Sequence, residues 1–176
     1  MSDPWPDRLA SSAEMGTGTR PLLLVDVDGV VSLFGFEPPA PAGVVWTSVD
    51  GLPHALSRPA GVRLARLACT FDCAWCTGWE ERAEEQLPRL LGLPGGWPHM
   101  TFAAEPGASP RHWKLAAIEA ASGPDRPVAW IDDAFDATCE AWAAGRPGPA
   151  LLVRTDPATG LREDHVTRLE SWARGL

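Results

Sequence analysis

The chain has 176 residues, of which 45% are hydrophobic and 22% charged, which is typical of one globular domain with a substantial core. The formal net charge is -8, and the 15 Lys and Arg residues do not form a dense block. Because a surface that binds duplex nucleic acid needs clustered positive charge, the sequence argues against general nucleic-acid binding. An anionic ligand would need local positive charge, from a metal ion or a lysine, to offset the field of so acidic a chain.

The sequence lacks a run of about 18 apolar residues, so it predicts no transmembrane helix and no membrane partner. Residues 1–20 contain no basic leader followed by an apolar core, so they do not resemble a secretory signal, and we expect a cytoplasmic protein. The same residues are rich in Ser, Gly and Pro, which predicts a mobile tail ahead of a single domain over 21–176.

Two of the four cysteines, Cys73 and Cys76, form a CxxC. No second pair with metal-ligand spacing follows them, which argues against a structural zinc site. They lie in the apolar run DCAWC rather than at an exposed helix start, which argues against a redox motif. We therefore predict that both are small core residues on a buried strand.

Short apolar runs bounded by turn residues predict the strands. The first run, 21–25, is apolar on both faces and ends in Asp26-Val27-Asp28-Gly29, which is typical of a central strand in a parallel sheet. Segments 30–36 and 44–49 flank the Pro-rich stretch EPPAPAG and predict a hairpin with its tip there. The other predicted strands are 72–76, 99–102, 128–131 and 150–153.

Apolar residues at helical spacing, together with start and stop signals, predict the helices. Thr77 and Glu80 have the spacing of a capping box, and Ser109-Pro110 is a cap followed by proline in a first turn. The predicted helices are 61–68, 77–87, 109–121, 135–145 and 166–173. Because strands alternate with helices, the sequence predicts an α/β fold with a mostly parallel sheet and helices on both faces.

Polar residues follow three of the predicted strands, at the sheet edge where open α/β folds bind ligands. Asp26 and Asp28 follow the first strand, and Thr77 follows the second. Asp132 and Asp133 follow a later strand, and Lys114 lies on the predicted helix before it. We therefore expect these six residues to form one site.

These residue types suit phosphoryl transfer. A carboxylate can attack phosphorus and form an aspartyl-phosphate, and a second carboxylate two residues on can protonate the leaving oxygen and then activate water. A hydroxyl at a helix start can hold phosphate oxygens, and a lysine can stabilise the charge of the phosphoryl group. Carboxylates from neighbouring strands repel one another unless a cation lies between them, and Mg²⁺ prefers such oxygen ligands.

In this order, the residues resemble the four motifs of the haloacid dehalogenase-like (HAD) superfamily over about residues 21–155: Asp26-Val27-Asp28-Gly29-Val30, Thr77, Lys114 and Asp132-Asp133. The resemblance implies a Rossmann-like three-layer sandwich and phosphomonoester hydrolysis through an aspartyl-phosphate. It implies that Asp26 is the nucleophile and a Mg²⁺ ligand. It implies that Asp28 is the general acid/base and ligates Mg²⁺ through its backbone carbonyl.

The remaining motifs imply further roles. Thr77 and Gly78 would bind phosphate, Lys114 would bridge the nucleophile and the phosphate, and Asp132 or Asp133 would complete the Mg²⁺ site. The acid at Asp28 resembles the phosphatase branch, because the dehalogenase branch lacks it. A phosphate-binding or regulatory domain without turnover, and a phosphotransferase to an acceptor other than water, are the alternatives.

The segment 30–57 falls where this superfamily places a hairpin flap or a small cap, and it is too short for a large helical cap. The interval 77–114 is also too short for one, so we expect a comparatively open site. We expect the substrate to be a phosphorylated small molecule rather than a macromolecule. Because a second copy can supply a lid to an open site, a homodimer stays an open alternative.

Several of these residues also have a structural interpretation. Asp-Gly is a common turn, Thr77 suits a helix cap, and Lys114 suits a solvated helix face. The spacing Asp132-x3-Asp136 imitates a second pattern of the superfamily, whereas Asp133 and Asp136 also suit the start of the next helix. We favour the pair Asp132-Asp133 and leave open which member binds the metal.

The four His residues show no ligand spacing and are predicted surface or loop residues. Trp75, Trp130 and Trp142 are predicted core residues. Trp46 and Trp79 lie near the predicted site in the sequence, where either could stack on a substrate ring.

Overall fold

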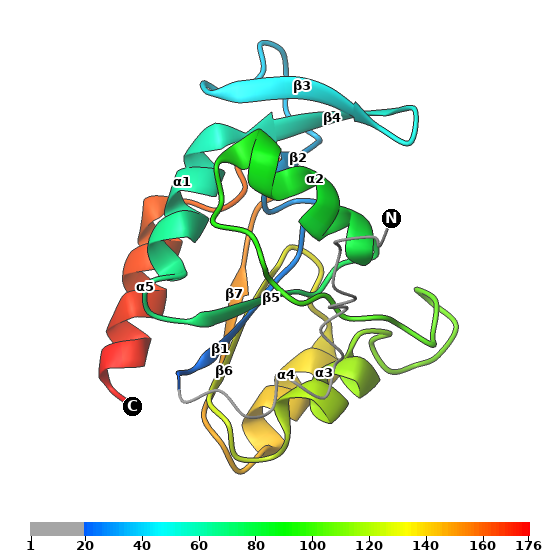
Figure 1. Cartoon of the computed structure of the whole chain (residues 1–176). Helices are drawn as coiled ribbons and strands as arrows, with labels where there is room; N and C mark the ends of the chain where they lie inside the picture. The colour runs from blue at the N-terminus through cyan, green and yellow to red at the C-terminus, as the bar shows by residue number, and fades with distance from the viewer. Residues whose placement is uncertain (1–19) are drawn as a thin grey trace, which may run out of the picture.

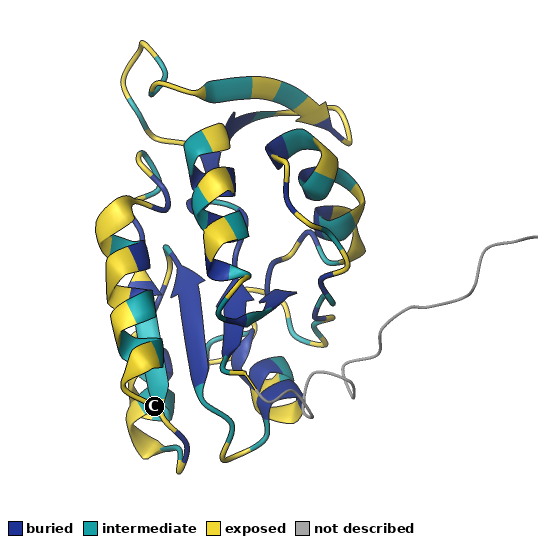
Figure 2. Ribbon diagram, turned by 60° about the vertical axis from the view of Figure 1, so that its left-hand side comes forward, coloured by how far each residue is buried: buried dark blue, intermediate teal, exposed yellow. Residues whose placement is uncertain are grey.

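The computed structural model describes residues 20–176, and its centre is a parallel sheet in the order β5-β1-β6-β7 (Figure 1). These strands are β1 (Leu22–Val25), β5 (Asp72–Trp75), β6 (Val128–Asp132) and β7 (Ala150–Arg154). Every residue of β1 and β6 is buried, as their uninterrupted apolar runs predict (Figure 2). The predicted α/β fold with a mostly parallel sheet is confirmed. The predicted tail, 1–20, lies outside the described residues except for Arg20.

Helices cover both faces of the sheet, which makes three layers. One core cluster joins the sheet to α1 (Arg58–Leu67), α2 (Glu81–Leu91) and α5 (Glu163–Arg174). The other joins it to α3 (Leu115–Ser122) and α4 (Ala137–Gly145). Among residues 20–176, no helix combines the length and apolar character that crossing a membrane requires.

The CxxC belongs to the core, as predicted. Cys73 and Cys76 are buried and pack into the clusters on opposite faces of the sheet. Burial raises the pKa of the Cys73 thiol to about 12, and burial also raises the pKa of Cys76. Trp75 and Trp130 are fully buried and Trp142 is partly buried, which confirms their core assignment.

A small antiparallel sheet, which we call the flap, follows β1. It contains β2 (Ser32–Leu33), β3 (Val44–Val49) and β4 (Leu52–Ser57) in the order β2-β4-β3. Figure 1 shows the flap beyond the carboxyl ends of the central strands. Trp46 lies on β3 with 61% of its surface exposed.

The predicted hairpin between 30–36 and 44–49 is wrong, because β3 pairs with β4 instead. The turn between them is Asp50-Gly51, where φ is 52° and 80°. Two consecutive positive φ angles match the twist of a tight hairpin, and Asp-Gly favours them. The segment 32–33 pairs with the other edge of β4.

All five predicted helix starts differ from the structure; α4 begins at Ala137 rather than 135 and α5 at Glu163 rather than 166. α1 begins at Arg58 rather than 61, because Ser57 Oγ caps it by accepting from the Ala60 N–H at 3.3 Å. α2 begins at Glu81 rather than 77, and Thr77 and Glu80 form no capping box. The Glu80 carboxylate instead accepts from the Phe102 N–H at 3.1 Å.

The predicted helix 109–121 is shorter than its sequence signals indicate, because α3 begins at Leu115. Ser109 Oγ accepts from the Arg111 N–H at 3.1 Å in a turn, and the His112 N–H donates to Thr138 Oγ1 of α4 at 2.9 Å. The His112 N–H thus bonds to a side chain of α4 and not to a backbone carbonyl one helical turn earlier. The predicted strand 99–102 contributes only an isolated bridge, between His99 and Trp75.

Candidate active site

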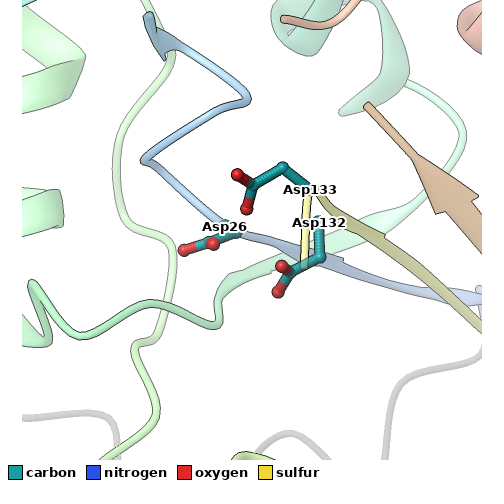
Figure 3. Close-up of side chains that lie close together, drawn as sticks. All are labelled: Asp26, Asp132 and Asp133. Carbon is teal, nitrogen blue, oxygen red and sulfur yellow. The ribbon is translucent and has the colours of Figure 1, made fainter. Parts of the chain in front are cut away.

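The candidate site lies at the carboxyl ends of β1 and β6, which are neighbours in the sheet. After β1 the chain continues to β5 on one side, and it later returns to β6 on the other. Such a reversal opens a crevice beyond the strand ends, where α/β folds bind ligands. Asp26 directly follows β1, Asp132 ends β6 and Asp133 follows it. Figure 3 shows the three carboxylates gathered at these strand ends.

Lys114 lies between two of these carboxylates. Its Nζ is 3.0 Å from Asp26 Oδ2 and 2.6 Å from Asp132 Oδ2, and its side chain is only 3% exposed. Burial lowers the pKa of Lys114, but the attraction of Asp26 and Asp132 outweighs burial and holds that pKa above its ordinary value. Lys114 is therefore a charged bridge between the ends of β1 and β6. The alternative, that Lys114 lies on a solvated helix face, is excluded because its side chain is buried.

The Asp132 carboxylate is fixed by further donors. The Ala134 N–H donates to its Oδ1 at 3.0 Å, and Trp130 Nε1 donates to its Oδ2 at 3.1 Å. At Asp26, the Val27 N–H donates to Oδ1 at 2.8 Å. Asp132 thus has three donors in all and Asp26 has two, so Asp26 retains more of its acceptor capacity for a ligand.

The site carries an excess of negative charge, since three carboxylates surround one lysine. Burial raises the pKa of Asp26 to about 7, against the opposing effect of Lys114, and Asp132 raises it further. Burial and the neighbouring Asp132 also raise the pKa of Asp133. This electrostatic cost indicates that a cation would stabilise the charged form of the site.

Oxygen atoms of Asp26, Asp132 and Asp133 all lie within 4.8 Å of one another. The set contains only carboxylate oxygens, which are the ligands that Mg²⁺ and other hard divalent cations prefer. Donor chemistry, spacing and excess charge all fit a metal ion at this point. Asp132 and Asp133 both belong to this cluster, so the structure does not single out one of them as the metal ligand.

Asp136 does not join the cluster. It is the N-cap of α4, where its Oδ1 accepts from the Thr138 N–H at 2.8 Å and the Cys139 N–H at 3.1 Å. The Asp132-x3-Asp136 spacing therefore reflects a helix cap rather than a ligand pair. The prediction that Asp133 caps this helix is also excluded, because Asp136 does so.

Gly29 allows the loop after β1 to approach the end of β6. Its φ is 71°, and a Cβ atom on it would lie 2.5 Å from Asp133 Cγ. The Gly29 carbonyl accepts from Thr155 Oγ1 at 2.8 Å, and the Thr155 N–H donates to the Asp132 carbonyl at 3.0 Å. The residue after β7 thus ties together the two loops that carry the aspartates.

We expect Gly29→Ala to destabilise the protein by about 2–4 kcal/mol, because the new methyl group combines a strained φ with a clash against Asp133. It should also weaken Mg²⁺ binding by displacing that carboxylate. Urea unfolding and a Mg²⁺ titration measure the two effects. Gly35→Ala is the matched control: its φ is 72° but nothing lies within 4 Å, so it should cost only about 1 kcal/mol. Equal losses for both variants would contradict this account.

The Asp28 side chain lies apart from the carboxylate cluster of Asp26, Asp132 and Asp133. Its side chain is 50% exposed, and Trp79 Nε1 donates to its Oδ2 at 3.0 Å. His54 of β4 packs against the Trp79 ring, and its Nδ1 lies 3.9 Å from Asp28 Oδ1. Asp28 and its two neighbours line a pocket of about 250 Å³ between the flap and α2. Asp28 and Asp26 thus occupy different environments, although only Val27 separates them.

Thr77 and Gly78 lie in the loop between β5 and α2. Thr77 is 1% exposed, and its Oγ1 accepts from the Trp79 N–H at 3.3 Å. This turn orients the backbone that leads into α2, beside the pocket that Gly78 also lines. The phosphate-binding role predicted for the pair stays a prediction.

The sequence does not predict a site role for His54, Thr155 or Trp130. His54 and Thr155 come from segments whose contact with the motifs depends on the tertiary fold. Trp130 lies two residues before Asp132 on β6, where its burial alone was predicted. A usable signal exists for Lys114, which is the only lysine among 15 basic residues. No protein-family model and no curated protein matches the chain.

Proposed function

We propose that this chain is a Mg²⁺-dependent phosphomonoester hydrolase of the HAD type, which acts through an aspartyl-phosphate. The observation that carries the proposal is the buried Lys114 bridge between Asp26 and Asp132, with Asp133 within 4.8 Å of both carboxylates. A purely structural ion pair would balance its charges, because unpaired buried carboxylates are costly. Here carboxylates outnumber the lysine at the ligand-binding edge of the sheet.

The overall arrangement supports the HAD assignment. A parallel sheet with helices on both faces, and a short flap directly after the first strand, are compatible with that family's layout. Asp26, Thr77 and Asp132 lie at or just beyond the carboxyl ends of β1, β5 and β6, and Lys114 lies at the start of α3, which supports the proposal.

In the proposed first step, an Asp26 carboxylate oxygen attacks phosphorus, and the ester P–O bond breaks. Asp28 donates its proton to the departing alkoxide, which leaves as an alcohol. In the second step, the Asp28 carboxylate takes a proton from water, the water oxygen attacks phosphorus, and the bond from Asp26 to phosphorus breaks. Lys114 stabilises the charge on Asp26 and on the phosphoryl group, and Thr77 and Gly78 hold phosphoryl oxygens.

Asp26, Asp132 and Asp133 would hold Mg²⁺, together with the Asp28 backbone carbonyl that the resemblance implies. When bound, the ion would supply positive charge that offsets the carboxylates and the phosphoryl oxygens. The pocket of about 250 Å³ beside Asp28 supports a compact organic leaving group and therefore a small-molecule substrate.

A panel of phosphomonoesters assayed with Mg²⁺ and with EDTA tests the proposal. We expect phosphate release with Mg²⁺, a loss of at least about 100-fold in EDTA, and recovery when Mg²⁺ but not Ca²⁺ is restored. Ca²⁺ should fail because its longer bonds and higher coordination number change the geometry of the site. The absence of release from every ester would exclude a hydrolase. Transfer of the phosphoryl group to an added alcohol, without release of inorganic phosphate, would indicate a phosphotransferase instead.

Metal binding can be measured without turnover because Lys114 is the only lysine. Protein made with 15N-labelled lysine contains a single labelled ammonium, and it lies 3.0 Å from Asp26 and 2.6 Å from Asp132. Its NMR signal should shift as Mg²⁺ is added and should return with EDTA. An unchanged signal at millimolar Mg²⁺ would argue against a metal ion at this site.

A further inference from the structure

We propose that Trp79 is a positioning residue that orients the general acid Asp28 toward the leaving group, with His54 supporting the Trp79 ring. The inference rests on the proposed function, since it assigns a role to the hydrogen bond between Trp79 Nε1 and Asp28 Oδ2 in that reaction. That bond is 3.0 Å long and joins the loop before α2 to the loop after β1.

Asp28 needs such a partner. Its side chain is half exposed on a loop, so it would otherwise rotate among several conformations. Trp79 is 9% exposed, which makes it a far more rigid group than the carboxyl that it contacts. A rigid donor that limits this rotation would lower the entropy lost when the acid meets the leaving oxygen.

The Trp79 ring is itself held in two ways. Its backbone N–H donates to Thr77 Oγ1 at 3.3 Å. The His54 ring packs edge-on against it with centroids 4.6 Å apart, and His54 Nδ1 lies 3.1 Å from Ser32 Oγ of β2. The flap therefore supports Trp79 from one side, while the Thr77 turn supports it from the other.

The hydrogen bond also distinguishes the two oxygens of Asp28. An indole N–H is a donor and never an acceptor, so Oδ2 must accept from Trp79. The acid proton then belongs on Oδ1. When the ester P–O bond breaks, this proton passes from Oδ1 to the leaving alkoxide, and Asp28 remains as a carboxylate bound to Trp79.

Asp28, His54 and Trp79 all line the pocket of about 250 Å³ between the flap and α2. Val49 and Leu52 add an apolar wall, and Asp50 of the flap turn pairs with Arg82 of α2 beside it. A leaving group in this pocket would lie next to the Asp28 carboxyl group. Trp79 thus forms part of the pocket and also aims the acid at whatever the pocket holds.

A series of esters with leaving groups of different basicity tests the role. A poor leaving group, such as an alkyl alcohol, needs protonation as the bond breaks, whereas p-nitrophenolate leaves without it. Trp79→Phe keeps the aromatic packing and removes the N–H. We expect kcat/KM to fall about 10- to 100-fold for alkyl phosphates and less than about 3-fold for p-nitrophenyl phosphate.

Three comparisons make the test specific. Asp28→Asn should show the same dependence on leaving group, with a larger loss of kcat/KM for alkyl phosphates. Because Trp79 acts through Asp28, the double variant Asp28→Asn/Trp79→Phe should lose little more kcat/KM than Asp28→Asn alone. Trp172→Phe, in α5 against Phe71, is a matched control and should show no dependence on leaving group. If Trp79→Phe folds poorly, benzothienylalanine at position 79 replaces only the N–H by sulfur.

The outcomes separate the inference from the function on which it rests. If the wild type hydrolyses no ester, the proposed function fails and the inference fails with it. If the wild type is active but both position-79 variants lose activity equally on all esters, or lose none, hydrolysis stands and the positioning role is overturned. Additive losses in the double variant would also overturn it.

Discussion

Asp26→Asn should lower phosphatase turnover by at least about 10⁴-fold, because it keeps the shape of the side chain and removes the nucleophilic oxygen. The remaining site residues cannot replace it. Asp132 is held by Lys114, Trp130 and the Ala134 N–H, and the Asp28 side chain lies outside the carboxylate cluster of Asp26, Asp132 and Asp133. Steady-state kinetics with Mg²⁺, and the loss of a phosphorylated enzyme in rapid-quench experiments, measure the effect.

The same variant should be more stable than the wild type in EDTA. Burial raises the pKa of Asp26 from its ordinary 3.8 to about 7, so the folded protein binds this proton more tightly than the unfolded chain does. The corresponding stability is present below pH 3.8 and is lost as the pH rises through about 7. Removing the charge should therefore gain about 4 kcal/mol at pH 8 and about 2 kcal/mol at pH 5.

Asp136→Asn is the control for both the turnover and the stability measurements. Asp136 is exposed and caps α4, and asparagine is an equally good N-cap, so this variant should keep both its turnover and its stability. Full activity in Asp26→Asn would exclude Asp26 as the nucleophile even if the protein hydrolyses phosphate esters. A stability gain that does not grow with pH would contradict the electrostatic explanation.

Lys114→Met should cost both activity and stability. It leaves the buried Asp26 and Asp132 carboxylates without their shared ammonium, and breaking a buried ion pair from one side costs about 3–5 kcal/mol. Turnover should fall by about 10²- to 10³-fold, because charge on the phosphoryl group loses a fixed donor. Urea unfolding with EDTA and kinetics with Mg²⁺ measure these losses.

Mg²⁺ should restore part of the stability of Lys114→Met, since a second cation would offset the same carboxylates. Lys114→Arg should not restore activity, because a planar guanidinium does not fit the space of an ammonium held by two carboxylates. Arg126→Met is the matched control. It removes a cation paired with Asp72 at the opposite end of the sheet, so it should affect stability without reducing turnover. Wild-type kinetics in Lys114→Met would contradict the assigned role.

The central strands and the acids that follow them can be predicted from the residues alone. The runs at 22–25 and 128–131 are apolar on both faces, which is typical of strands inside a parallel sheet, and their alternation with helices favours that fold. Once those strands are parallel, Asp26 and Asp132 must lie at the same edge. This is local information, because the residues of each strand and the turn after it are contiguous in the chain.

The strand that pairs with β3, the starts of α2 and α3, and the side chains around Asp28 could not be predicted from the sequence. Each of these depends on a contact between distant segments, such as the His112 N–H with Thr138 or Trp79 with Asp28. Local propensity is weak beside such contacts. The buried Lys114 illustrates the difference: its position in the sequence suits a solvated helix face, and only the packing of α3 against the sheet places its ammonium between two carboxylates.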